Sequence, residues 1–121
     1  MADVVVRRRG AATALRRGDV HWVRFDPGEG VEIRKTRPAI VVSNDAANRH
    51  LSSVTVVPLT SNLKRVSPSQ VLVELRGRSS KAMAEQIRTV DRSRLVGRRI
   101  GVLSGIAMTD LERVMRIHLA L

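Results

Sequence analysis

The apolar residues of this chain fall into short segments separated by Gly, Pro or polar residues, a spacing typical of β-strands. Residues 37–43 form the most continuous segment, as expected for a strand buried on both faces. Val71, Val73 and Leu75 instead stand at alternate positions, which places them on one face of a strand. The pattern therefore predicts six short strands, at residues 19–25, 37–43, 53–59, 71–75, 82–90 and 99–103.

The C-terminal segment differs, because its apolar residues recur at helical spacing over residues 111–121. Thr109 begins a capping-box pattern and is one candidate for the start of this helix. Ser104 is a second candidate, and the sequence alone leaves both open. The repeating positions are Leu111, Val114, Met115, His118 and Leu119.

The segments between the strands are polar. Three of them are predicted loops, at residues 27–36, 44–52 and 60–69, and residues 91–95 can form a single helical turn. Six short strands followed by one helix predict an α+β domain built on a small, strongly bent sheet or partial barrel. Alternating β-α-β units are not expected.

Length and composition limit the protein class. With 121 residues the chain can form one domain, expected at residues 17–121, preceded by a basic, poorly ordered arm at residues 1–16. There is no cysteine, which excludes disulfides and thiol chemistry. No apolar stretch approaches the roughly 18 residues of a membrane span, and the start lacks a signal-peptide pattern. We therefore expect a cytoplasmic protein without membrane contact.

The chain is strongly basic, with 22 Lys and Arg against 11 Asp and Glu and a formal net charge of +11. Only part of this excess lies in the N-terminal arm, so the body of the domain is basic too. Such a charge attracts polyanions, with nucleic acid as the default partner and an acidic protein segment as the other. Trp22 and Phe25 are the only aromatic residues, which argues against recognition of RNA on an aromatic stacking platform.

Two residues at the ends of predicted strands suit phosphate chemistry. Arg37 has a planar, permanently charged guanidinium that can bind two phosphate oxygens at once, and Thr60 has a hydroxyl that can donate to a third. Both also have a purely structural interpretation. Arg37 can form an ion pair at the start of its strand, and Thr60 can cap the loop that follows.

Four blocks of sequence resemble MazF/PemK-type toxins of toxin–antitoxin systems. They run in order at residues 17–27, 36–45, 55–61 and 84–91, beginning with Arg-Gly-Asp-Val-His-Trp-Val and Thr-Arg-Pro-Ala-Ile-Val-Val. Four ordered blocks are far more specific than any one of them. The resemblance extends from about Arg17 to the C-terminus and leaves out the basic arm.

This resemblance implies the CcdB/MazF-like fold, a small SH3-like antiparallel β-barrel with a C-terminal α-helix, assembled as a homodimer. It also implies an enzyme, a sequence-selective endoribonuclease (mRNA interferase) that cuts single-stranded RNA without a metal or other cofactor. The implied protein partner is a cognate antitoxin, whose acidic tail occupies the basic groove.

The resemblance also assigns candidate site residues. Arg37 matches the family's Arg before Pro, Thr60 its functional Thr, and Glu32 the acidic residue of its first loop, so these three are expected to be catalytic. Asn44 and Gln86 match RNA-contacting residues. The remaining RNA-binding candidates lie on loops and strand ends near the expected site: Arg34, Lys35, Ser61, Lys64, Arg65 and Arg88.

The general base and acid stay unassigned. Thr60 is a poor base at its ordinary pKa, so its expected role is positioning and stabilisation. Glu32 can serve as the base if its loop folds over the site, whereas the His that some relatives carry beside this acid is Val31 here. Glu85 and Gln86 are adjacent, so a regular strand would direct them to opposite faces. No His, Asp or Glu pair has the spacing of metal ligands, and no metal site is predicted.

Two other functions remain open at this stage. One is a non-enzymatic toxin of the same fold, such as CcdB, which binds DNA gyrase. The other is a nucleic-acid-binding module without turnover, which the charge and the Arg-rich arm support equally well.

Overall fold

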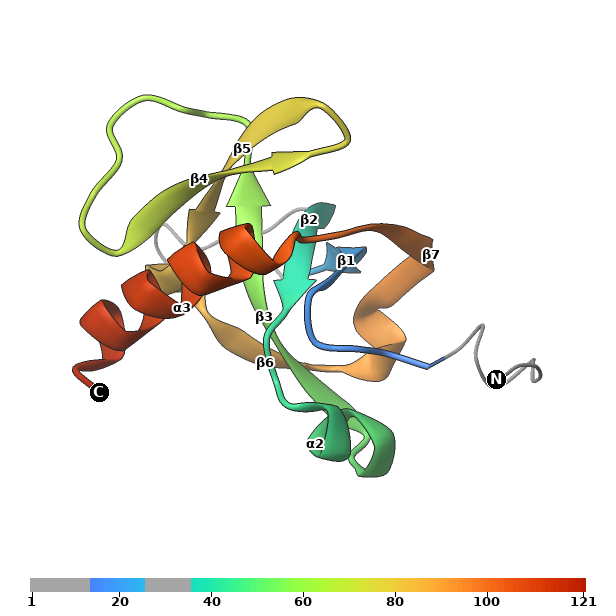
Figure 1. Cartoon of the computed structure of the whole chain (residues 1–121). Helices are drawn as coiled ribbons and strands as arrows, with labels where there is room; N and C mark the ends of the chain where they lie inside the picture. The colour runs from blue at the N-terminus through green and yellow to red at the C-terminus, as the bar shows by residue number, and fades with distance from the viewer. Residues whose placement is uncertain (1–13, 26–35) are drawn as a thin grey trace.

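The computed structural model describes residues 14–25 and 36–121, and in these ranges the chain forms a curved antiparallel sheet crossed by one long helix (Figure 1). The two α-helices are α2 (Asp45–His50) and α3 (Gly105–Leu119), and the two short 3-10 turns are η1 (Ala84–Gln86) and η2 (Arg92–Arg94). The strands are β1 (Asp19–Arg24), β2 (Thr36–Val41), β3 (Ser53–Thr60), β4 (Gln70–Leu75), β5 (Arg78–Met83), β6 (Arg88–Asp91) and β7 (Leu95–Val102).

The sheet has the strand order β4-β5-β3-β2-β1-β7, with β6 paired to β3 outside this path. One edge of β3 changes partner along its length, pairing first with β6 and then with β5. This change turns the β4–β5 hairpin away from the plane of β1 and β2, so the sheet curls (Figure 1). The predicted α+β fold, a partial barrel with a C-terminal helix, is confirmed.

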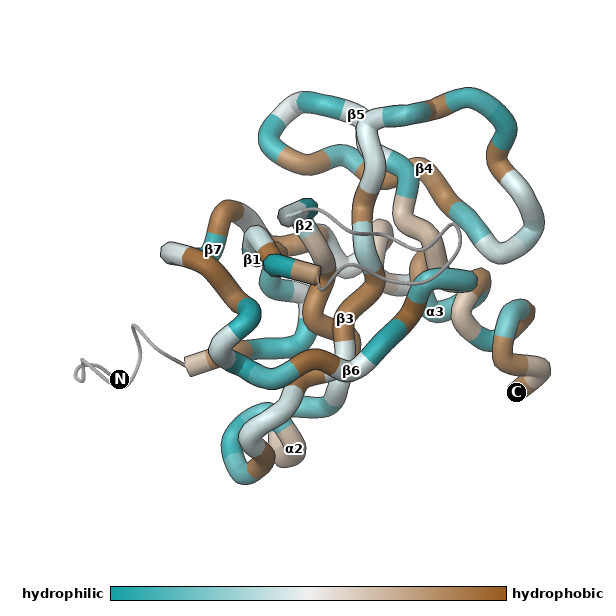
Figure 2. The backbone as a smooth tube through the Cα atoms, turned by 180° about the vertical axis from the view of Figure 1, so that it is seen from behind, coloured by the Kyte–Doolittle hydropathy of each residue, from teal (hydrophilic) through white to brown (hydrophobic). Residues whose placement is uncertain are grey.

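Alternation along the central strands gives the sheet two apolar faces, and Figure 2 shows the hydrophobic stretches of β2 and β3 in the middle of the fold. On one face, Ile40, Val57 and Leu59 pack with Leu111 and Val114 of α3. On the other, odd-numbered residues of β1 and β2 meet even-numbered residues of β3. This second cluster contains Val23, Phe25, Ala39, Val41, Val54 and Val56. We call this second face the barrel face.

Ser104, and not Thr109, begins the C-terminal helix. The Ser104 hydroxyl accepts a hydrogen bond from the amide of Ala107 at 3.1 Å, which satisfies a donor that a helix start otherwise leaves unpaired. Thr109 lies inside the helix, where its hydroxyl donates to the carbonyl of Gly105 at 3.1 Å. The helix therefore begins earlier than the apolar repeat at residues 111–121 indicated.

The expectation of a loop at residues 44–52 was wrong, because this segment contains α2. Asn44 caps the helix by accepting from the amide of Ala47 at 2.8 Å. Asn48 is buried, and its amide donates to the carbonyl of Ser43 at 2.9 Å. Because polar contacts and not an apolar stripe hold this short helix, the sequence showed no helical periodicity there.

The expected strand at residues 82–90 is also wrong in part, because η1 interrupts it between β5 and β6. Most of β5 was missed, since its first residues are polar and it forms only by pairing with β4 across a turn at Arg76 and Gly77. The last strand begins at Leu95, four residues earlier than predicted. The helical turn expected within residues 91–95 is confirmed as η2.

Candidate active site and nucleic-acid interface

Arg37 lies near the start of β2, and its side chain is on the barrel face of the sheet. It pairs with Val23 in register, and alternation places it on the same face as Ala39 and Val41. The side chain is half-buried, and its Nε is buried without a hydrogen-bond partner. Within the described residues no carboxylate pairs with it, so that part of the chain provides no support for a structural ion pair at this strand start.

Thr60 lies at the end of β3 on the same face as Val54 and Val56. Its hydroxyl oxygen accepts a hydrogen bond from the amide of Asn62 at 3.2 Å, so the loop-capping role considered from the sequence is realised. A hydroxyl carries one hydrogen and two acceptor lone pairs. The Thr60 hydroxyl therefore still has a proton to donate.

The sheet register relates Arg37 to Thr60. β2 and β3 pair through Ala39 and Pro58, Ile40 and Val57, and Val41 and Val56. Arg37 and Thr60 each lie two residues beyond the last of these pairs, Ala39 and Pro58, and alternation places both on the barrel face. A guanidinium and a hydroxyl are thus directed to one region of the barrel face.

Arg88 extends this basic region along the barrel face. It pairs with Val56 in register, and its guanidinium carbon lies 5.3 Å from the centroid of the Phe25 ring. A cavity of about 240 Å³ adjoins these two residues. Arg24 and Arg94 also line it, and neither was predicted from the sequence, where each reads only as another basic residue.

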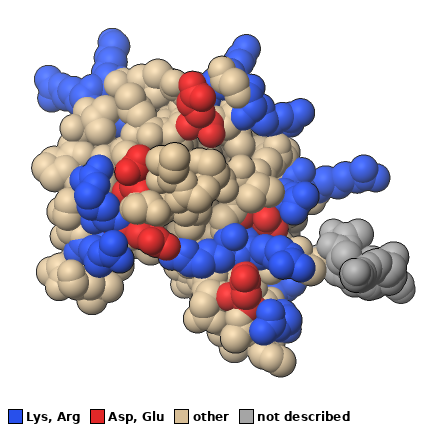
Figure 3. All heavy atoms as spheres, in the orientation of Figure 1, with Lys and Arg blue, Asp and Glu red and all other residues tan. Residues whose placement is uncertain are grey.

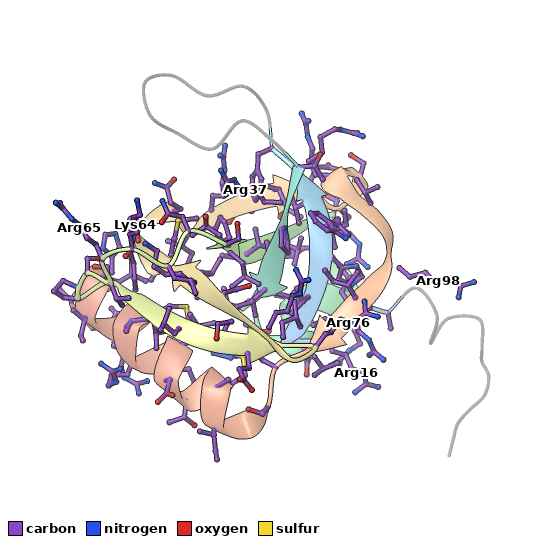
Figure 4. The ribbon with its side chains drawn as sticks, turned by 90° about the horizontal axis from the view of Figure 1, so that it is seen from above. Arg16, Arg37, Lys64, Arg65, Arg76 and Arg98 are labelled. Atoms are coloured by element: carbon purple, nitrogen blue, oxygen red, sulfur yellow. The ribbon has the colours of Figure 1, made fainter. Side chains whose placement is uncertain are left out.

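The loop after β3 carries three further predicted RNA-binding residues, Ser61, Lys64 and Arg65, all of them exposed. Figure 4 shows Lys64 and Arg65 on the same side of the molecule as Arg37, whereas Arg16, Arg76 and Arg98 lie on the other. The loop also has a supporting residue that sequence reasoning missed. The ammonium of Lys81 donates to the backbone carbonyls of Lys64 and Arg65.

Gln86 and Glu85 lie in η1, where a tight turn replaces the regular strand expected from the sequence. The Glu85 carboxylate accepts a hydrogen bond from Nε2 of Gln70 at 2.7 Å, which ties η1 to the start of β4. Gln86 is half-buried beside it. Both side chains therefore belong to the junction between β5 and β6.

Asn44 lies apart from Arg37, because Arg37 is near the start of β2 and Asn44 follows its end. Besides capping α2, Asn44 lines a separate cavity of about 540 Å³ between α3 and the start of β3. Arg17 and Glu112, which form an ion pair at 3.1 Å, line the same cavity. An RNA contact at Asn44 would thus require a strand that extends well beyond Arg37.

Three predicted site residues, Glu32, Arg34 and Lys35, lie outside the described residues, as does most of the predicted N-terminal arm.

The histidines lie at separate places. His21 is buried in β1, and burial lowers its pKa, with a nearby Arg99 acting in the same direction and Asp19 opposing it. His118 is hydrogen-bonded to the Ser69 hydroxyl at 3.0 Å.

The described parts of the chain hold no group of three or more His, Asp or Glu residues arranged to bind a metal ion. Across residues 14–25 and 36–121, no helix combines the length and apolar character needed to cross a bilayer.

Figure 3 shows Lys and Arg side chains around the rim of the face that carries α3, with Asp and Glu between them. This face is mixed in charge, and it is the net charge of +11 of the full sequence that suits a polyanionic partner.

Comparison with known proteins agrees with this architecture. Endoribonuclease MazF9 of Mycobacterium tuberculosis (strain ATCC 25618 / H37Rv) is 40% identical over 116 residues, which cover 88% of this chain and 98% of that protein. The structure of MazF from Deinococcus radiodurans matches with a TM-score of 0.78 at 25% identity, over 89% of this chain and 98% of the other.

A second solved structure is an endoribonuclease from a mycobacterial species in complex with its cognate antitoxin. It matches with a TM-score of 0.73 at 28% identity, over 89% of this chain and 97% of the other. The sequence profile of the family described as PemK-like, MazF-like toxin of type II toxin-antitoxin system matches residues 16–119. The chain therefore belongs to the PemK-like, MazF-like family of toxins of type II toxin–antitoxin systems, as its four sequence blocks indicated.

Proposed function

We propose that this toxin is an endoribonuclease that cuts single-stranded RNA, selectively for sequence and without a metal ion, and thereby stops translation and growth in the cytoplasm. The observation that carries the proposal is the placement of Arg37 and Thr60 on one face, with no carboxylate of the described residues paired to Arg37. The names of the relative and of the structural neighbours support the same activity.

Cleavage of RNA without a metal requires three tasks. A 2′-hydroxyl loses its proton and attacks the adjacent phosphorus, a phosphorane with extra negative charge forms, and the 5′-oxygen leaves with a proton. Arg37 performs the second task, because its two-pronged guanidinium neutralises the oxygens of the phosphorane. Its half-buried position strengthens this effect, since water screens the charge less there.

Thr60 donates its hydroxyl proton to a phosphate oxygen while it accepts from the amide of Asn62. The hydrogen bond from the amide of Asn62 occupies one lone pair of the Thr60 hydroxyl and so restricts the directions open to its hydrogen before the RNA arrives. Proton transfer falls to other groups. Glu32 is the candidate base of the sequence resemblance, and Glu85 is held by Gln70 at the β5–β6 junction.

Basic residues around this pair bind the RNA backbone. Arg88 and the cavity beside Phe25 provide one contact region, and the loop with Lys64 and Arg65 provides another. Contacts to phosphates position the RNA, whereas contacts to base edges select its sequence. Ser61, Asn44 and Gln86 are the uncharged candidates for selecting the sequence, with Arg34 and Lys35 completing the basic set.

A homodimer and an antitoxin complete the proposed assembly. The end of α3 exposes Ile117, Leu119 and Leu121 beside the 540 Å³ cavity, an apolar region suited to a second copy. The basic barrel face suits the acidic tail of an antitoxin, and one matching neighbour is a complex with its cognate antitoxin. Sedimentation at micromolar concentration should give the mass of a dimer.

The activity is tested by incubating purified protein with single-stranded RNA in excess EDTA. We expect cleavage that leaves 5′-hydroxyl ends, and we expect Arg37→Ala to abolish it. Circular dichroism of the variant should match the parent protein, which separates lost chemistry from lost folding. Cleavage that EDTA prevents, or full activity of Arg37→Ala, would contradict the proposed mechanism.

Mapping of the cut ends on total RNA then identifies the selected sequence and shows whether mRNA, tRNA or rRNA is the main target. If the RNA stays intact while topoisomerase-linked DNA breaks accumulate in cells that produce the toxin, the gyrase-binding alternative is correct. Salt-sensitive RNA binding without any product over hours would instead identify a binding module.

A further inference from the structure

Lys81 carries a charge that the proposed chemistry does not use. It lies in β5 with only 7% of its surface exposed, and its ammonium donates to the carbonyl oxygens of Lys64 and Arg65 at 3.0 and 2.9 Å. Lysine is seldom buried without a carboxylate partner, because the desolvated charge is costly. Within the described residues no carboxylate forms an ion pair with Lys81. Its buried charge is therefore directed at the loop after β3.

This loop needs such a support. Residues 61–68 are all exposed, so apolar burial does not hold them. Side chains near the two ends make local hydrogen bonds: Thr60 to the amide of Asn62, Asn62 to the amide of Lys64, and Gln70 to the amide of Ser67. Lys81 reaches the middle of the loop from the sheet.

The backbone at Arg65 shows what Lys81 holds. Arg65 has a φ of +53°, in the left-handed region that residues with a Cβ rarely adopt. With this backbone conformation, the successive carbonyls of Lys64 and Arg65 both accept hydrogen bonds from the ammonium of Lys81. Removing the ammonium would leave the carbonyls without that partner and the strained residue without its support.

Lys81 is also placed to relate this loop to the site. It pairs with Thr60 in register across β3 and β5, and cross-strand partners share a face of the sheet. Thr60 in turn holds the first residues of the loop through the amide of Asn62. The hydroxyl of the site and the anchor of the loop are therefore neighbours on one rigid sheet.

We propose that Lys81 is a positioning residue: its buried ammonium fixes the backbone at Lys64 and Arg65, so that the loop presents these cations to the RNA beside Thr60 in one conformation and contributes to the choice of cut sequence. This inference rests on the proposed ribonuclease function. Lys81 itself does not contact the RNA; it acts through the loop.

The test replaces Lys81 by Met, which keeps the length of the side chain and removes the charge. We expect KM for a single-stranded RNA substrate to rise about tenfold, kcat to change little, and the mapped cut sites to spread over more sequences. A tenfold change corresponds to about 1.4 kcal/mol. Arg113→Met on the exposed side of α3 is the matched loss of one charge and should leave KM and the cut sites unchanged. Lys81→Arg, which retains a donor cation, should partly restore selectivity.

A loop readout that needs no activity accompanies the kinetics. Trypsin cleaves after Lys64 and Arg65, and we expect Lys81→Met to speed cleavage at these two bonds, as followed by mass spectrometry, while Arg113→Met does not. If wild type cuts RNA and Lys81→Met matches it in KM, cut sites and trypsin sensitivity, the inference is overturned and the proposed function stands. If wild type cuts no RNA, the proposed function fails, and the trypsin result alone decides whether Lys81 fixes the loop.

A second pair of variants tests the loop from its own side and applies even if Lys81→Met fails to fold. Arg65→Asn and Arg65→Val remove the same charge, but Asn tolerates a left-handed backbone and Val does not. We expect Arg65→Val to spread the cut sites more widely than Arg65→Asn. Equal cut-site distributions for the two variants would show that the backbone conformation at this position does not matter, against the proposal.

Discussion

Arg37 and Thr60 project from neighbouring strands onto the same face of the sheet, each two residues beyond the last β2–β3 pair, Ala39 and Pro58. No hydrogen bond joins their side chains, although both lie in the described part of the chain. The Arg37 guanidinium and the Thr60 hydroxyl are therefore both free to donate hydrogen bonds to a ligand. The placement suits a phosphate, which accepts from both.

The contribution of the Thr60 hydroxyl to cleavage can be separated from that of the volume of the side chain. Thr60→Val keeps the volume and removes the donor, so we expect kcat to fall about 10²-fold, as when one transition-state donor is lost elsewhere. Thr60→Ser keeps the hydroxyl and should retain most of the activity. Single-turnover cleavage of an RNA oligonucleotide measures both. Equal rates for the two variants would show that the hydroxyl has only its loop-capping role with Asn62.

Substitution of Arg37 by Lys tests whether charge alone is sufficient. Lysine retains the positive charge but cannot bind two phosphate oxygens in a plane. We therefore expect Arg37→Lys to retain binding to RNA and to lose about 10²-fold in kcat. Filter binding and single-turnover rates separate the two effects. A variant as fast as the parent protein would mean that Arg37 only attracts the RNA.

His21 should make folding stability depend on pH. The residue is 8% exposed, neither ring nitrogen has a hydrogen-bond partner, and burial lowers its pKa below the ordinary value of 6.5. The unfolded chain therefore takes up a proton at a higher pH than the folded chain does. Stability is fully present above pH 6.5 and is lost as the pH falls from there towards the folded pKa.

Urea unfolding between pH 7.5 and 5.5 measures this effect, because most carboxylates stay ionised in that range. The free energy of unfolding should fall with decreasing pH by at most about 1.4 kcal/mol per unit from this one group. His21→Leu should flatten the profile. An unchanged slope in this variant would show that His21 is not the source of the pH dependence.

The strands that pack on both faces of the sheet were predictable from the sequence, because burial there leaves a continuous or alternating apolar pattern. β3 is an example, with Val54 and Val56 on one face and Val57 and Leu59 on the other. β5 was not predictable in this way. Its polar residues become a strand through pairing with β4, and a turn with Arg76 at a φ of +55° gives no strong sequence signal.

The candidate site was predictable only in part, for a similar reason. Sequence resemblance selected Arg37 and Thr60, a basic residue near a strand end was expected to bind RNA at Arg88, and the sheet places all three on the barrel face. Their proximity depends on strand order, which hydrophobic periodicity does not contain. Lys81 had no signal at all, since a lysine after two serines reads as exposed, and its burial arises from the fold of a distant loop.

Gly101 in β7 leaves room for the β4–β5 hairpin to pack on the sheet. A Cβ at this position would lie 2.5 Å from Cδ1 of Leu75, closer than any real contact, whereas a Cβ at Gly105 would meet nothing within 4 Å. We expect Gly101→Ala to lower the free energy of unfolding by no more than about 1 kcal/mol, because the methyl group displaces only the end of the half-buried Leu75 side chain. Gly105→Ala is the matched control and should not destabilise the protein.

If contact with Leu75 is the reason that Gly101→Ala destabilises the protein, then shortening Leu75 should remove this loss of stability. In urea unfolding, Leu75→Ala alone loses stability through lost apolar contact, but Gly101→Ala should cost little more when added to it. The double-mutant cycle is therefore expected to show a favourable coupling of about 1 kcal/mol between the two substitutions. Strictly additive effects would mean that Gly101 is needed for its backbone and not for the space it leaves to the hairpin.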